Sequence, residues 1–119
     1  MTDREELETA VKALDSKKAE KITALKVKDL TILANYFVIA SATSTTQVKA
    51  LADAVEYNME QAGVKPKSIE GVGSRSWIVL DYIDVIVHIF TEQDREFYQL
   101  ERLWSDAEKV DLSDIVKPD

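Results

Sequence analysis

The 119-residue sequence contains no cysteine and only one histidine, His88. The lack of cysteine excludes disulfides, thiolate metal sites and cysteine nucleophiles. A histidine that acts as a general base or a metal ligand needs partner side chains, and no such partners stand near His88 in the sequence. On an alternating strand His88 shares a face with Ile86 and Phe90, so we expect it to be a core residue.

Long apolar runs are also absent. The longest ones, such as Tyr36 to Ala40 and Val85 to Val87, are far shorter than the roughly 20 residues that span a bilayer. The first residues, Met1 to Glu6, are charged and acidic, unlike the basic start of a signal peptide. We therefore expect a soluble, cytoplasmic protein that does not bind membranes.

Basic residues are in the minority: 15 lysines and arginines face 22 acidic residues, which gives a formal net charge of -7. Such a charge repels phosphate backbones and favours basic partners. An RNA-binding module remains an alternative that would need a local basic stripe. The one lysine cluster that could supply it is Lys17, Lys18, Lys21, Lys26 and Lys28. Acidic residues are interleaved with these lysines, so a solvated face is the preferred interpretation, and we expect no direct DNA binding.

The residues that are present indicate one globular domain over residues 1–119, because 45% are hydrophobic and 31% are charged. Three capping pairs, Thr2/Glu5, Ser44/Gln47 and Thr91/Asp94, each precede apolar residues at helical spacing. They predict helices over residues 3–17, from Ser44 to the stop at Gly63, and after Thr91, where Phe97, Leu100 and Trp104 share one face.

Five segments have the composition of strands. They are Ile22 to Val27 near an edge, Tyr36 to Ala40 in the centre, 66–70 as a further edge strand, and the antiparallel pair Trp77 to Tyr82 and Val85 to Phe90. The order of elements predicts an α/β (α+β) fold with a mixed five-stranded sheet and flanking helices. Residues 105–119 form a C-terminal tail whose structure the pattern does not define.

A catalytic interpretation starts from Gly73 and Ser74 followed by Asp81 and Asp84, which together suggest a metal-dependent nucleotidyltransferase. Two carboxylates that share a metal from one strand should lie two residues apart, whereas these are three apart and bracket a turn. The Gly-Ser pair stands in a predicted hairpin and does not begin a helix that could hold phosphate. We therefore prefer to interpret these four residues as turn-forming and surface residues, and we keep the metal-dependent nucleotidyltransferase as an alternative.

Aromatic and acidic residues also meet around the predicted hairpin. Trp77 and Tyr82 flank a core strand, while Glu70, Asp81 and Asp84 lie near the same turns. Large aromatics beside acids are typical of a protein-binding patch. The alternative is that Trp77 packs in the core and the acids are solvated turn residues.

The helix after Thr91 carries more aromatic surface than one helix face needs. Part of it is expected to be buried at a dimer interface or under the tail.

Four segments form the most specific pattern in the chain: Tyr36 to Ala40, Trp77 to Tyr82, Asp84 to Phe90, and Arg95 to Trp104. The Asp-Val-Ile-Val-His-Ile-Phe strand followed closely by Phe-Tyr-x-Leu-Glu-Arg-Leu-Trp is more specific than any catalytic motif above. Taken in chain order, these segments resemble the iojap-like ribosomal silencing factors, and the similarity covers nearly the whole chain.

This resemblance implies a nucleotidyltransferase-like fold without transferase activity, catalytic residues, metal or cofactor. It implies a chain that is dimeric when free and binds the large ribosomal subunit through ribosomal protein fourteen. That contact would sterically block joining of the subunits and repress translation under nutrient limitation or in stationary phase. Relatives in organelles are linked to ribosome assembly, which remains an alternative. The resemblance and the aromatic-acidic pattern together predict a contact surface of Glu70, Trp77, Asp81 and Tyr82.

Three residues near the second helix depart from the family pattern. Ala42 stands where glycine is expected, Thr46 where arginine is common, and Asn35 where aspartate is frequent. Without the permissive glycine and the cation, a phosphate-binding role for this loop is disfavoured.

Overall fold

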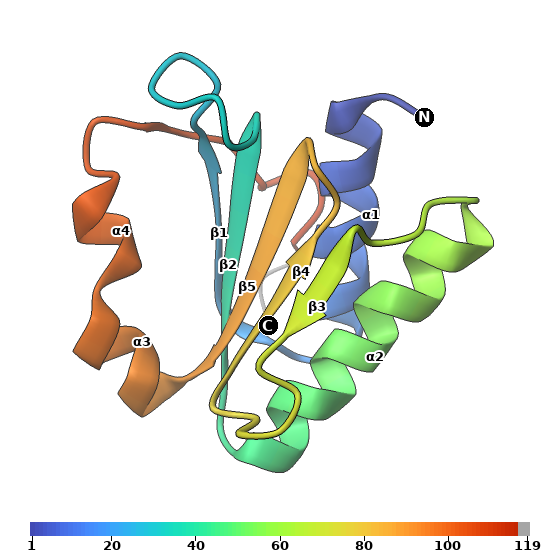
Figure 1. Cartoon of the computed structure of the whole chain (residues 1–119), viewed down its shortest axis with the longest axis vertical. Helices are drawn as coiled ribbons and strands as arrows, with labels where there is room; N and C mark the ends of the chain where they lie inside the picture. Colours follow the sequence, from blue (N-terminus) through green and yellow to red (C-terminus); the bar gives the residue numbers. More distant parts are fainter. Residues whose placement is uncertain (117–119) are drawn as a thin grey trace.

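The fold is a three-layer arrangement with a mixed six-stranded sheet in the middle, in a computed structural model that describes residues 1–116 (Figure 1). The strand order in the sheet is β3-β4-β5-β2-β1-β6. The strands are β1 (Glu20–Lys26), β2 (Tyr36–Ala42), β3 (Ser68–Glu70), β4 (Trp77–Asp81), β5 (Val85–Thr91) and β6 (Glu108–Lys109). The helices are α1 (Asp3–Ser16), α2 (Thr45–Gln61), α3 (Glu92–Tyr98) and α4 (Leu100–Leu103).

Helices α1 and α2 cover one face of the sheet, and both begin at the predicted caps (Figure 1). Thr2 and Glu5 form a complete capping box, in which each side chain accepts a hydrogen bond from the other residue's backbone N–H. The side chain of Ser44 accepts from the N–H of Gln47, but the Gln47 side chain accepts from the N–H of Thr43. The second box is thus shifted by one residue, although the helix still starts where predicted.

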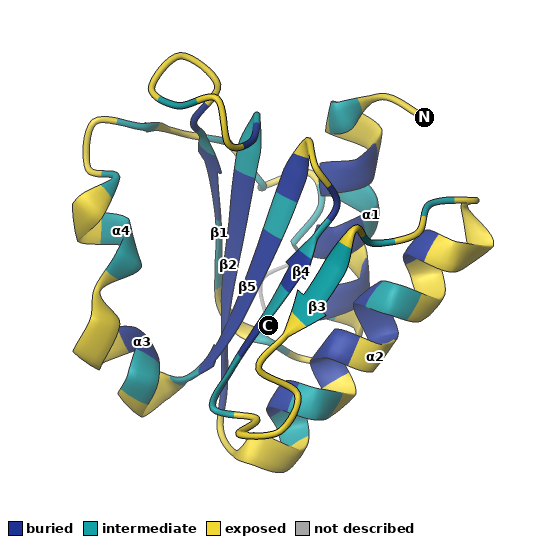
Figure 2. Cartoon of the chain, viewed as in Figure 1, coloured by how far each residue is buried: buried dark blue, intermediate teal, exposed yellow. Residues whose placement is uncertain are grey.

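The two longest buried strands, β2 and β5, run parallel in the centre of the sheet (Figure 2). Burial on both faces explains why Tyr36 to Ala40 is apolar throughout. Strands β4 and β5 form the predicted antiparallel hairpin. Its turn is closed by a hydrogen bond from the N–H of Ile83 to the Asp81 side chain.

Helices α3 and α4 lie on the opposite face of the sheet, where the sequence predicted a single helix. A single helix through Phe97, Leu100 and Trp104 was expected, but Gln99 has a left-handed backbone (φ 47°) that ends α3 and starts α4. In a straight helix, Tyr98 and Leu100 would point about 160° apart. The break lets both approach the sheet: Tyr98 packs on Trp77, and Leu100 joins the core on this side.

The predicted strand count was one too low, because part of the C-terminal tail joins the sheet. Strand β6 pairs antiparallel with β1, which would otherwise be the sheet edge. Its two residues, Glu108 and Lys109, are both charged and exposed, so the sequence shows no alternation of apolar and polar residues from which this strand could be predicted. The part of the predicted tail from 117 to 119 lies outside the described residues. No helix between residues 1 and 116 is long and apolar enough to cross a membrane.

Candidate protein-binding surface

The side chains of β4 alternate between the two faces of the sheet. Ile78 and Leu80 point toward α1 and α2, where they are fully buried, whereas Trp77, Val79 and Asp81 point to the other face and remain partly exposed. The strand register places Glu70 beside Val79, and Ile86 beside Asp81. We call the resulting patch the Trp77 surface; it consists of Glu70, Trp77, Val79, Asp81, Ile86 and Tyr98.

Trp77 is the anchor of this surface because three neighbours hold its indole ring. The ring stacks on Phe90 at a centroid distance of 4.8 Å and packs against Tyr98, also at 4.8 Å. Its Nε1 donates a hydrogen bond of 3.3 Å to Nδ1 of His88. A half-buried aromatic that is already ordered loses little side-chain entropy on binding, which favours its use in an interface.

The structure brings together three of the four residues predicted for the contact surface. Glu70, Trp77 and Asp81 lie on the same face of the β3–β4–β5 hairpins. Tyr82 instead lies under α1 and α2 and is 4% exposed. A buried side chain does not offer a partner any contact area, so Tyr82 is left out of the Trp77 surface.

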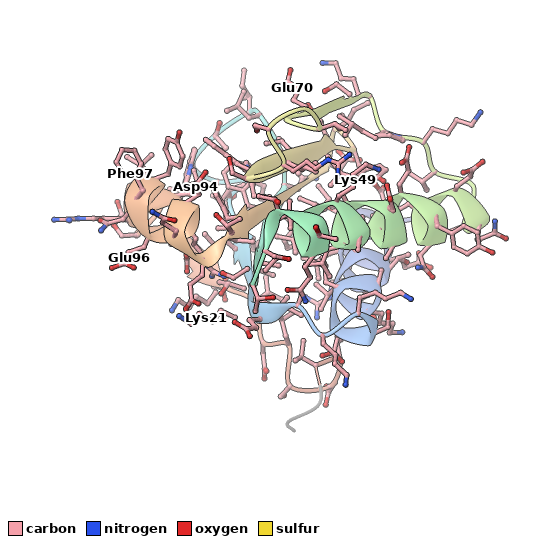
Figure 3. All side chains as sticks on the ribbon, turned by 90° about the horizontal axis from the view of Figure 1, so that it is seen from below. Lys21, Lys49, Glu70, Asp94, Glu96 and Phe97 are labelled. Atoms are coloured by element: carbon pink, nitrogen blue, oxygen red, sulfur yellow. The ribbon has the colours of Figure 1, made fainter. Side chains whose placement is uncertain are left out.

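Phe97 and Leu103, which were not predicted to be exposed from the sequence, are 78% and 76% exposed. Figure 3 shows Phe97 on the outer side of α3, pointing away from the sheet. The predicted excess of aromatic surface after Thr91 is therefore real, and the described part of the tail does not cover it. The signal that could have found these residues is the number of apolar side chains, which exceeds what one helix face can bury.

His88 lies beneath the Trp77 surface, and it is buried as predicted, with 8% of its area exposed. Burial lowers the pKa of His88 from 6.5 to about 4, although the nearby Asp81 carboxylate acts in the opposite direction. The ring is therefore neutral at pH 7. Since Nδ1 accepts from Trp77, the ring proton sits on Nε2.

This burial predicts a loss of stability in mild acid. Between pH 6.5 and pH 4 the unfolded chain binds a proton at His88 that the folded chain does not. The free energy of unfolding should therefore fall by about 3 kcal/mol across this range and level off below it. Urea unfolding at a series of pH values measures the effect.

The matched control is His88→Asn, whose side-chain oxygen can still accept from Trp77 but does not titrate. The variant should lack this part of the pH dependence. An identical pH dependence in both proteins would show that another group causes it.

The aspartates of the nucleotidyltransferase alternative have structural roles at the β4–β5 turn. The Asp81 carboxylate accepts from the N–H of Ile83, and the Asp84 carbonyl accepts from the N–H groups of Asn35 and Tyr36. Within residues 1–116, no three His, Asp or Glu side chains are grouped so that they could hold a metal ion. The structure thus supports the interpretation of these aspartates as turn residues.

Two of the three residues that depart from the expected family pattern, Ala42 and Asn35, have local structural roles. Ala42 ends β2 and is fully buried, and the Asn35 amide donates a 2.9 Å hydrogen bond to Asp3 at the start of α1. Thr46 is exposed in the first turn of α2. No lysine or arginine lies in the loop from 42 to 46.

Comparison with known proteins decides the family. A family profile described as "Ribosomal silencing factor during starvation" matches residues 1–119. The chain belongs to this family. Relatives named "Ribosomal silencing factor RsfS" include one from Halalkalibacterium halodurans, which is 37% identical over 98% of this chain and 99% of its own length.

Two further similar proteins extend the comparison. A crystal structure of a protein from Chromobacterium violaceum superposes with a TM-score of 0.86 at 35% identity and covers 88% of both chains. "Protein Iojap, chloroplastic" from Zea mays is 37% identical over 85% of this chain, which spans 44% of the maize protein. The fold class expected from the sequence is therefore confirmed.

Proposed function

We propose that this silencing factor represses translation by binding the large ribosomal subunit through ribosomal protein fourteen, thereby keeping the small subunit from joining. The mechanism is competition for a surface and involves no bond formation or cleavage. It acts where ribosomes translate, in the cytoplasm. The names of the relatives support a regulatory role connected with the ribosome.

The observation that carries the proposal is the Trp77 surface. It combines an anchored indole ring with a half-exposed Tyr98 and two carboxylates, from Glu70 and Asp81. Interface hot spots have this composition: aromatic anchors at the centre and polar groups at the rim.

The charge of the chain supports a basic partner. The formal net charge is -7, and ribosomal proteins are commonly basic because they contact RNA phosphates. Opposite potentials accelerate encounter and orient docking.

The exposed apolar side chains of α3 and α4, Phe97 and Leu103, also support a homodimer in the free protein. The dimer would cover these side chains until the ribosome is bound.

A double variant that removes two charges tests the electrostatic part of the proposal. Asp81→Asn keeps the oxygen that accepts from Ile83, and Glu70→Gln affects an exposed side chain. We expect association with isolated ribosomal protein fourteen to slow by about threefold at low salt and by less at high salt. Biolayer interferometry at two salt concentrations measures both rates.

The control is Glu20→Gln with Glu60→Gln, which changes the net charge by the same amount at exposed positions of β1 and α2. This variant should associate almost like the wild type. Equal slowing of both double variants would mean that only net charge matters and that the Trp77 surface does not face the partner.

A further inference from the structure

We propose that Arg95 is a positioning residue for ribosome docking, because its guanidinium fixes the α3–α4 arm (residues 92–103) against the sheet. The arm carries Tyr98, which completes the Trp77 surface. The inference rests on the proposed function, since the position of the arm matters for docking only if this surface binds the ribosome.

The Arg95 side chain is the most buried cationic group on this face, in a residue that is 9% exposed. Its Nη1 donates to the Lys21 carbonyl at 2.6 Å and to Oγ of Ser41 at 2.9 Å, and its Nη2 donates to Oγ1 of Thr23 at 3.1 Å. Its Nε donates to Oε1 of Glu101 at 2.8 Å. One guanidinium thus joins β1, β2 and α4.

The sheet side of this contact is built by an irregularity in β1. Lys21 has a positive φ of 50°, and the register between β1 and β2 shifts between Glu20 and Thr23. Such a bulge turns a carbonyl out of the strand ladder. The Lys21 carbonyl accepts a hydrogen bond of 2.6 Å from Arg95 there, and a longer one of 3.3 Å from the Thr23 hydroxyl.

The arm side of this contact crosses the break at Gln99. Arg95 lies in α3 and Glu101 in α4, so their ion pair fixes the angle between the two short helices. The hydrogen bond from Arg95 lowers the pKa of Glu101, which keeps its carboxylate charged at neutral pH.

Around Arg95, few other polar contacts hold the arm against the sheet. A cleft of about 550 Å³ separates it from the sheet and is lined by polar and charged side chains, among them Lys21, Glu92 and Arg102. The additional ion pair between Lys21 and Glu92 is exposed, and exposed pairs contribute little. Apolar contacts with the sheet are made C-terminal to Arg95: Tyr98 packs on Trp77 and Phe90, and Leu100 and the following Trp104 pack against the core.

The position of the arm decides the shape of the Trp77 surface. Tyr98 follows Arg95 by three residues, so it lies one turn further along α3, where its ring packs on Trp77. If the guanidinium is removed, the arm can turn about Thr91 and Gln99, and only a fraction of the molecules presents Tyr98 correctly. The apparent dissociation constant rises by the inverse of that fraction.

The test measures arm position and ribosome binding in the same variants. The chain has no cysteine, so Tyr57→Cys on α2 and Leu103→Cys on the arm, both at exposed positions, give two unique sites for spin labels. Labelled chains are diluted with unlabelled protein, and the distance distribution is recorded by pulsed electron paramagnetic resonance. Affinity for the purified large ribosomal subunit is measured without labels or added cysteines.

We expect Arg95→Met to widen the distance distribution clearly and to weaken binding about tenfold, while circular dichroism shows an intact fold. The matched control is Arg102→Met in the same arm, because Arg102 is exposed and donates only to Gln99 among the described residues. This control should resemble the wild type in both measurements. If Arg95→Met does not fold, Glu101→Gln provides the same two measurements with smaller changes in the same direction.

Two results would overturn the inference: a narrow distance distribution in the folded Arg95 and Glu101 variants, or unchanged binding despite a widened one. Failure of the proposed function looks different, because the wild type itself would then not bind the large subunit. A narrow distribution with weakened binding would also contradict a positioning role, since the effect on binding would not act through the arm.

Discussion

Replacing Gly71 with alanine is expected to destabilise the protein by about 3 kcal/mol or more, the largest effect among the three glycines. Gly71 has a φ of +86°, a conformation in which a side chain costs roughly 1–2 kcal/mol. A Cβ atom at this position would also lie 2.0 Å from the backbone oxygen of Trp77. Because that oxygen belongs to the backbone, either the turn or β4 must shift.

The other two glycines provide graded controls. Gly63 also has a positive φ, +85°, but a Cβ there meets nothing within 4 Å, so Gly63→Ala should cost only about 1 kcal/mol. Gly73 has open space and no positive φ, so Gly73→Ala should be close to neutral. Urea unfolding of the three variants checks the order. Equal effects at Gly71 and Gly63 would show that the close approach to Trp77 does not constrain the turn.

Trp77→Ala is expected to weaken binding to the large ribosomal subunit by about 30-fold or more, because truncation of a central aromatic anchor typically costs at least 2 kcal/mol. The substitution removes the ring that contacts Phe90, Tyr98 and His88. Tyr98→Ala, at a more exposed position of the same surface, should weaken binding in the same direction with less effect on the fold.

The control for these variants is Tyr57→Ala. Tyr57 is 62% exposed on α2, on the other side of the sheet from the Trp77 surface. Sedimentation binding at a temperature where all variants are folded should show normal affinity for this control. If Tyr57→Ala weakened binding as much as Trp77→Ala did, the contact would lie elsewhere or would depend only on overall stability.

Local patterns in the sequence were sufficient to predict most of the fold. The Thr2/Glu5 box, the apolar run from Tyr36 and the β4–β5 hairpin each depend on neighbouring residues, and the structure contains them. The break at Gln99 depends on a distant cause, because it lets Tyr98 and Leu100 reach the sheet. Strand β6 depends on β1, with which it pairs, and its own two charged residues carry no strand signal.

The candidate site was predictable to a smaller extent. Alternation along β4 could have separated Trp77 and Asp81 from Tyr82, because residues an odd number of positions apart point to opposite faces. The hairpin places Tyr82 under the helices accordingly. The role of Arg95 was not predictable, since its partners Lys21, Thr23 and Ser41 lie 54 to 74 residues away in the chain.

The most direct test of the central claim is a subunit-joining assay with purified small and large ribosomal subunits, followed by light scattering and sucrose-gradient sedimentation. The account predicts that the wild-type protein sediments with the large subunit and suppresses joining, and that Trp77→Ala does so only at much higher concentration. A wild-type protein that stays at the top of the gradient while joining proceeds normally would contradict it.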